Sequence, residues 1–191
     1  MGLLWSEHLK NARNAAVCFQ NAYRLAPKLV PNIQAARRLF GEVGNWQMAA
    51  QLLDAEAAAA RSEPERVALM VEKAAVLEDK LGKSDEAFAI LEQCLERAPG
   101  DIGVLSALES AYAARGDTAR LKDVFLRLAE AIADPGLKCH YLISAAHLCE
   151  GPLGQPSEAS ELYRRAFELQ RRDPGVLSAI KRSAEREGRP E

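Results

Sequence analysis

The sequence predicts an all-α protein, an α-solenoid in which about five antiparallel helix pairs stack in chain order. The five residues Gly103–Ala107 recur unchanged as Gly175–Ala179, 72 residues later, and a fixed period of this size is typical of stacked repeats. Apolar residues recur at helical spacing between glycine-containing turns. Alanine is abundant, and the period-two alternation typical of strands is absent.

Each 72-residue period contains sub-units of 34 and 38 residues, and each sub-unit predicts two helices joined by a short turn. The four additional residues make about one helical turn, which we expect in the helices around Ala57–Val67 and Ala129–Cys139. The repeat is marked early in each second helix by Ala15, Ala49, Ala87, Leu121 and Ala159. We expect a single domain, 1–191, with repeat units at about 1–28, 29–63, 64–100, 101–134 and 135–172 and a partial unit at 173–191.

The pattern indicates roughly eleven helices, of which the first and last are incomplete, so we expect a piece of a longer protein. Each complete pair shows one apolar face per helix. In chain order these faces contain Ile33, Ala36, Leu39 and Phe40, then Ala49, Leu52 and Leu53; Val71, Ala74 and Leu77, then Ala87, Ile90, Leu91 and Leu95; Ile102, Leu105, Leu108 and Tyr112, then Leu121, Val124, Phe125 and Leu128; and Ile143, Ala146 and Cys149, then Ala159, Leu162, Tyr163 and Phe167.

The turns inside the pairs carry helix stop and start signals. Gly44-Asn45 and Gly116-Asp117 each combine a residue that ends one helix with a residue that caps the next. Gly82 and Gly154 occupy the equivalent positions in the other pairs. Pro64 and Pro135 begin the longer sub-units, and proline is well tolerated in the first turn of a helix.

The composition indicates a soluble helical array without a strong charge preference. Residues 1–100 contain 12 basic and 13 acidic side chains, and the remainder contains 13 and 14. We therefore expect no nucleic-acid or anionic-membrane partner. No apolar run approaches the roughly 20 residues of a membrane-spanning helix. The segment Met1–Glu7 does not resemble a signal peptide, so we expect a cytoplasmic location.

Cysteine and histidine residues predict no metal site. The four cysteines, Cys18, Cys94, Cys139 and Cys149, form no CxxC pair and align with apolar positions of the other repeats, as small hydrophobic residues would in a reducing compartment.

His140 and His147 share one expected helix, but they align with alanines and would need further ligands to hold a metal. No phosphate-binding loop or nucleophile elbow occurs, so we expect no enzyme activity and no cofactor.

The aromatic, turn and small-residue positions resemble those of tetratricopeptide repeats. Phe40 and Tyr112 stand late in first helices, and Ala15, Phe19, Ala22 and Pro27 form a nearly complete second-helix signature. The resemblance implies a right-handed superhelix whose first helices line a concave groove that binds a peptide or a partner helix. The sequence departs from the family in its 38-residue sub-units and at the positions of Glu78, Glu150 and His147.

Helical geometry assigns the groove-facing side of each first helix. A floor of small side chains would admit an extended peptide or a helix, although the same residues would also be small if the superhelix were merely tight. The lysine, asparagine and arginine set that grips a C-terminal carboxylate in some family members is incomplete. The expected partner-binding residues are Gln34, Arg38, Glu72, Lys73, Val76, Ser106, Ser110, Tyr141, Ser144, Ser178 and Arg182.

Three functions are compatible with this pattern. A non-enzymatic scaffold that binds a protein or peptide is favoured, because repeat arrays present long curved surfaces. A structural spacer or self-association module is the alternative, and a regulatory arm fused to an enzyme would require a neighbouring domain. Trp46 follows a turn and is interpreted either as a partner contact or as an anchor for helix packing.

Overall fold

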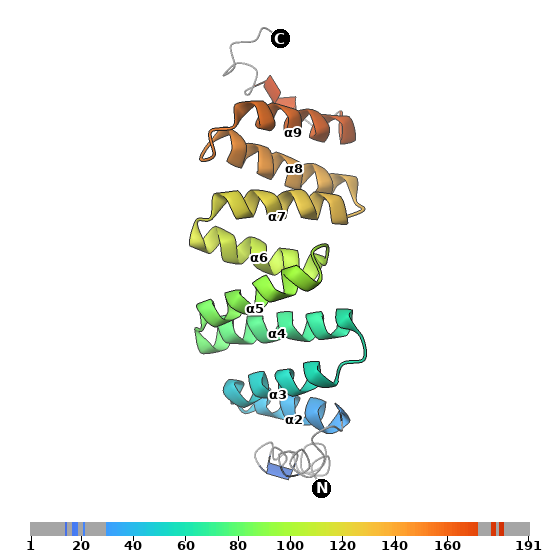
Figure 1. The fold of residues 1–191 in the computed structure, drawn as a ribbon, viewed down its shortest axis with the longest axis vertical. Coiled ribbons are helices and arrows are strands. Elements are labelled where there is room, and N and C mark those ends of the chain that lie inside the picture. Colours follow the sequence, from blue (N-terminus) through green and yellow to red (C-terminus); the bar gives the residue numbers. More distant parts are fainter. Residues whose placement is uncertain are drawn as a thin grey trace. The chain divides into compact units, whose positions relative to one another are not determined.

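The computed structural model describes residues 30–171 together with Asn14, Val17, Cys18, Asn21, Leu177, Ser178, Ile180 and Lys181. These residues form helices, turns and loops, with no strand among them (Figure 1). The chain divides into two compact units, Met1–Ala98 and Pro99–Glu191. The expectation of one continuous domain stays a prediction, and all four residues of the second-helix signature, Ala15, Phe19, Ala22 and Pro27, lie outside the described residues.

In the first unit, α2 (Val30–Glu42), α3 (Trp46–Ala59), α4 (Glu63–Leu81) and α5 (Ser84–Arg97) follow one another in antiparallel order (Figure 1). Helix α3 packs against α2 and α4, and α4 also packs against α5. The buried cluster between α2 and α3 includes Ile33, Ala36 and Phe40, as the apolar spacing predicts.

The second unit contains α6 (Ile102–Arg115), α7 (Thr118–Ala131), α8 (Pro135–Glu150) and α9 (Pro156–Leu169), each packed against its neighbour in the chain. Tyr112 is buried late in α6, where the resemblance places an aromatic residue. Four alanines, at positions 145, 146, 159 and 166, are fully enclosed between α8 and α9. Ile102 is the exception among the expected core residues, because it is the first residue of α6 and is 45% exposed.

The additional residues of the 38-residue sub-units lie in the first helices of two pairs. Helix α4 has 19 residues and α8 has 16, whereas α6 has 14. The expected ranges Ala57–Val67 and Ala129–Cys139 each begin in a second helix and end in a first helix. The expected lengthening is confirmed for the first helices α4 and α8 and wrong for the second helices α3 and α7, which keep 14 residues each. Pro64 and Pro135 lie in the first turns of α4 and α8, where Ser62 and Asp134 accept the capping hydrogen bonds.

The turns within the pairs confirm the stop and start signals. Gly82 and Gly116 end α4 and α6 in the left-handed conformation, with φ of 63° and 68°, where a side chain would be strained. Asp117 then caps α7 by accepting a hydrogen bond from the Arg120 amide. Asn45 caps α3 in the same way through the Met48 amide.

The cysteines occupy apolar positions, as the alignment of repeats predicts. Cys94, Cys139 and Cys149 are buried, Cys18 is half-buried, and none of the four forms a disulfide. Cys139 Sγ lies 3.7 Å from the carbonyl oxygen of Ala166 and donates a weak hydrogen bond to it. None of the described helices is both long enough and apolar enough to cross a membrane.

Candidate functional site

The first unit contains a groove between α2 and α4, which we call the α2–α4 groove. Its volume is about 420 Å³. Small and apolar side chains of α3 form its floor, and polar side chains of α2 and α4 form its two walls. It is lined by Gln34, Arg37, Arg38, Gly41, Trp46, Ala49, Leu53, Glu72 and Val76.

A buried carboxylate organises the walls of this groove. Glu56 of α3 is 5% exposed, and its Oε1 accepts a hydrogen bond of 2.8 Å from Gln34 Nε2. Its Oε2 lies 2.9 Å from Arg37 Nε. The same guanidinium also pairs with Glu72 across the groove. Residues of α2, α3 and α4 are thereby joined in one network, since a buried charge requires hydrogen-bonding partners.

Trp46 is both a packing residue and part of the groove surface. Its half-buried indole packs against the core of α2 and α3 and also lines the groove. A Cβ atom at Gly41 would lie 3.4 Å from the indole, which is an ordinary van der Waals contact. Lys80 Nζ lies 5.5 Å from the ring centroid, within the range of a cation–π interaction.

The structure brings four of the expected residues together in the α2–α4 groove: Gln34, Arg38, Glu72 and Val76. Arg38 is exposed and has no ion-pair partner within the described part of the chain. Lys73 does not line the groove, because its Nζ lies 2.6 Å from Asp54 Oδ1 of α3. Arg37 and Glu56 were not among the expected site residues, although both help to build the groove.

The expected residues of the second unit lie on α6 and α8. Ser106 and Ser110 are exposed, whereas Tyr141 and Ser144 are half-buried. The Tyr141 ring packs against Phe125, with centroids 5.9 Å apart. Burial raises the pKa of Tyr141, and the charge of Glu109 and a hydrogen bond to it raise that pKa further.

Ser178 is an exposed helical residue, and Arg182 lies outside the described residues. A role in partner binding stays a prediction for all eleven expected residues.

A second hollow of the first unit was not predicted from the sequence. It lies over α4 between the C-terminal halves of α3 and α5, and its volume is about 190 Å³. We call it the α3–α5 cavity. One feature of the sequence pointed to this cavity. The additional turn of α4 supplies two of its lining residues, Glu63 and Arg66. It is lined by Asp54, Ala57, Ala58, Glu63, Arg66, Val67, Met70, Gln93, Cys94 and Arg97.

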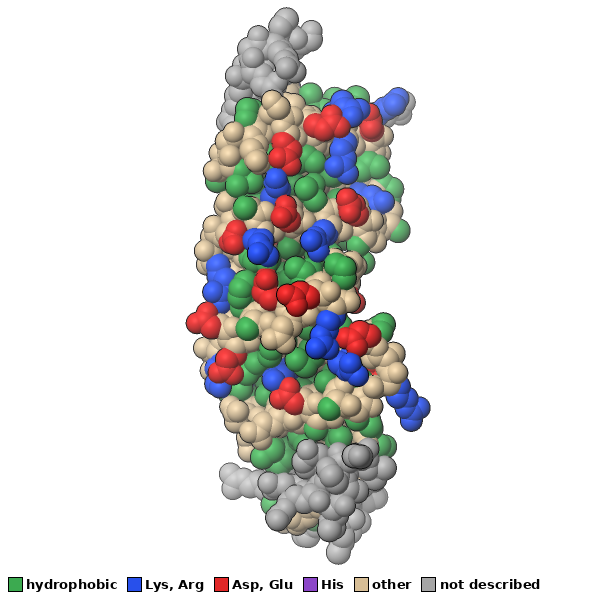
Figure 2. Space-filling model, viewed as in Figure 1, with side chains coloured by type: hydrophobic (Ala, Val, Ile, Leu, Met, Phe, Trp, Pro, Cys, Tyr) green, Lys and Arg blue, Asp and Glu red, His purple; other side chains and the backbone are tan. Residues whose placement is uncertain are grey.

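The two histidines of α8 lie on the surface rather than in the core. His140 stacks edge-on against Tyr141, and His147 stacks edge-on against Tyr163. Among the residues that the structure describes, no three metal-ligating side chains gather into a possible metal site. On the face shown in Figure 2, acidic and basic side chains are interspersed on each unit rather than segregated by sign.

Comparisons with known proteins agree with this geometry. The tetratricopeptide repeat family model matches residues 71–101, which span most of α4 and all of α5. A comparison with curated proteins finds no match. One similar solved chain is YrrB, described as a TPR protein with an unusual peptide-binding site. It is 18% identical with a TM-score of 0.53, over 94% of this chain and 88% of that chain.

Two further solved structures have the same kind of fold. A mutant of MamA is 20% identical with a TM-score of 0.51, over 84% of this chain and 88% of that chain. BtubC from P. vanneervenii is 14% identical with a TM-score of 0.52, over 96% of this chain and 84% of that chain. At these identities the likeness is one of fold. It shows that this chain has the fold of an α-helical repeat protein, and the tetratricopeptide repeat model matches within it at residues 71–101.

Proposed function

We propose that this protein is a non-enzymatic scaffold that binds a peptide or a partner helix in its α2–α4 groove. The observation that carries the proposal is the combination, in one groove, of an apolar surface with an exposed cation. Trp46, Leu53 and Val76 supply the apolar surface, and Arg38 supplies the cation. An apolar pocket with a few fixed polar groups at its edge is the usual form of a recognition site.

The network around Glu56 prepares this groove for binding. Gln34 and Arg37 are held before a ligand arrives, so less conformational entropy is lost on binding. The buried cysteines Cys94, Cys139 and Cys149 form no disulfide, which favours a reducing compartment such as the cytoplasm. Tetratricopeptide repeat proteins act by binding other proteins, which supports a scaffold over an enzyme.

The test starts from peptides selected from a random display library on the full chain. In a Trp5→Phe background, Trp46 is the one remaining tryptophan, since the sequence contains two. Binding in the groove is expected to change its fluorescence, and Arg38→Glu is expected to weaken binding about tenfold. Arg127→Glu is the matched control, because it makes the same charge change at an exposed arginine outside the groove.

Equal losses of affinity in Arg38→Glu and Arg127→Glu would argue against this groove. Selected peptides that leave both the Trp46 fluorescence and the Arg38→Glu affinity unchanged would reject it.

Self-association is a second candidate, favoured by two exposed leucines of the second unit. Leu137 lies near the start of α8, and Leu169 ends α9. Light scattering of the purified chain over a range of concentrations tests this function. A mass that rises with concentration in the wild type, but not in Leu137→Lys, would support it, and a constant monomer mass would exclude it.

A further inference from the structure

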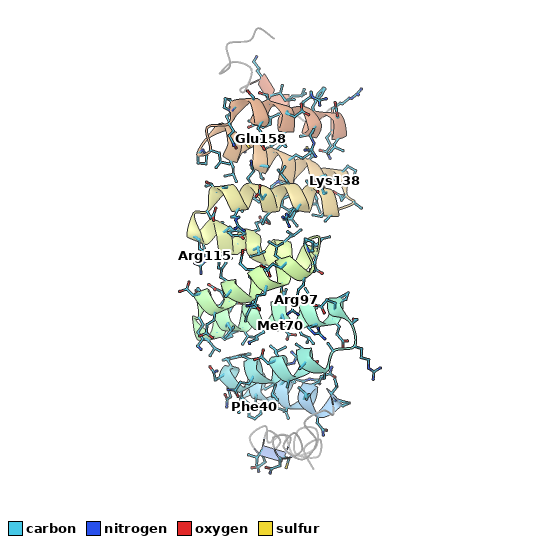
Figure 3. All side chains as sticks on the ribbon, viewed as in Figure 1. Phe40, Met70, Arg97, Arg115, Lys138 and Glu158 are labelled. Atoms are coloured by element: carbon cyan, nitrogen blue, oxygen red, sulfur yellow. The ribbon has the colours of Figure 1, made fainter. Side chains whose placement is uncertain are left out.

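The α3–α5 cavity has an apolar floor surrounded by charged side chains. Val67 and Met70 of α4 form the floor, and the walls include the small side chains of Ala57, Ala58 and Cys94. Figure 3 labels Met70 on α4 and Arg97 on α5, two residues that line this cavity. Its volume is below the about 300–1,000 Å³ typical of small-molecule sites, so it suits one inserted side chain.

This cavity is independent of the α2–α4 groove because the two use different faces of α4. With 3.6 residues per turn, Val67 and Met70 project on nearly the opposite side of the helix from Glu72 and Val76. The lining residues of the two sites do not overlap. A ligand in one site therefore leaves the other accessible.

Both carboxylates that line the cavity are already paired. Glu63 Oε2 lies 2.8 Å from Arg66 Nη1, and its Oε1 lies 3.3 Å from Arg97 Nη1. Asp54 is paired with Lys73, which lies outside the lining. The lining itself holds two guanidinium groups and two carboxylates, so the accessibility of each cation decides which one can bind a ligand.

Arg97 is the most accessible of these cations. Its side chain is 54% exposed, and a guanidinium has five N–H donors, of which Arg97 uses one on Glu63. The other donors are available to a carboxylate that approaches from solution.

We propose that the α3–α5 cavity is a second docking site, which takes an acidic peptide segment of a partner protein. A leucine, methionine or phenylalanine of that segment enters the cavity above Met70, and a neighbouring aspartate or glutamate binds Arg97. The size of the cavity selects a single apolar side chain, and the exposed guanidinium group of Arg97 selects a carboxylate. The two sites together make the first unit a scaffold for two ligands.

The test sorts the peptides selected on the full chain by their dependence on each site. Peptides that combine an acidic residue with a nearby apolar one are expected to lose about tenfold in affinity with Arg97→Glu and with Ala58→Phe. The same peptides are expected to retain their affinity for Arg38→Glu. Matched controls are Arg127→Glu on α7 and Ala89→Phe on α5, which replace exposed residues outside the cavity.

Methyl NMR gives a second readout that does not depend on a substitution in the cavity. The chain has three methionines, and Met70→Leu identifies the Met70 signal. A docked peptide is expected to shift the methyl signal of Met70 while leaving that of Met48, which packs against the α2–α3 core, unchanged.

The proposal is overturned if no selected peptide depends on Arg97 and Ala58, or if those that do lack an acidic residue. Peptides that depend on Arg97 but not on Arg38 would support this site even if the α2–α4 groove bound nothing.

Discussion

Arg37 on α2 is bonded to Glu56 on α3, with 2.9 Å between Nε and Oε2, at a position where the carboxylate is almost completely buried. The same arginine reaches Glu72 on α4. One side chain therefore connects the two helices of a repeat to the first helix of the next. The stacking of neighbouring repeats in the first unit depends on this polar bridge as well as on apolar packing.

Glu56→Gln is expected to lower the free energy of unfolding by about 1–3 kcal/mol, because it removes the charge that a half-buried guanidinium requires. Glu72→Gln is the matched control, since it removes the other partner of Arg37 at a site that is 48% exposed. An exposed pair contributes only about 0–1 kcal/mol. Urea unfolding followed by circular dichroism measures both variants, and a larger loss in Glu72→Gln would contradict the role assigned to Glu56.

Helix α5 offers a stabilising substitution at its start. Lys83 occupies the N-cap position with φ −101° and ψ 60° and forms no side-chain cap, whereas Asn45 caps α3 with φ −85° and ψ 69°. Lys83→Asn is therefore expected to provide the missing acceptor. It should be about 1 kcal/mol more stable than Lys83→Ala, which loses the same exposed pair with Glu86 without gaining a cap. Equal urea midpoints for these two variants would show that the side chain does not cap α5.

Local signals explain why most of the fold was predictable. Gly116 and Asp117 act through their own backbone and the next turn, so their roles do not depend on distant residues. The burial of Phe40 follows from the helical periodicity of α2 alone. The location of the additional turn was only partly predictable, because the repeat length does not say which helix of a pair is longer. Pro64 and Ser62 fix it at the start of α4.

The site was less predictable because the sequence does not fix the rotation of one helix against another. Helical spacing placed Lys73 beside Glu72 in the groove, yet Lys73 turns to Asp54 on α3. Glu56 lies three residues after Leu53, at a buried spacing of α3, but a charged residue type favours solvent exposure unless it is paired. Its burial depends on Arg37 and Gln34, which lie 19 and 22 residues away in the sequence.

The second unit is expected to lose stability at alkaline pH. Burial and the charge of Glu158 raise the pKa of the Cys149 thiol above its usual 9.0, and burial and Glu109 raise that of Tyr141 above 10.0. A hydrogen bond to Glu158 raises the pKa of Lys122 above 10.5. In all three cases the folded protein binds the proton more tightly than the unfolded chain does. The stability that these three protonated groups contribute is fully present below their pKa values in the unfolded chain. It is lost as the pH rises through their pKa values in the folded protein.

Urea midpoints measured from neutral pH to about pH 11 test this linkage. Tyr141→Phe and Cys149→Ala each remove one ionising group. In each variant the urea midpoint is therefore expected to fall less steeply with pH than in the wild type, whatever the midpoint at neutral pH. The decline with Cys149→Ala should begin at a higher pH than in the wild type, because the thiol has the lowest usual pKa of the three. A decline that is unchanged in both variants would assign the alkaline sensitivity to other groups.

Alanine at the contacts of the second unit is required by close packing rather than by helix propensity. Ala159 of α9 is completely buried among side chains of α8, whereas Ala114 of α6 is exposed. Leucine and alanine are both strong helix formers, so the two substitutions to leucine differ mainly in the space they need. Ala159→Leu is expected to lower the free energy of unfolding by about 1–3 kcal/mol through overpacking. Ala114→Leu should stay within about 0.5 kcal/mol of the wild type. Equal urea midpoints for the two variants would contradict this prediction. They would show that the contact between α8 and α9 accommodates leucine at position 159 without cost.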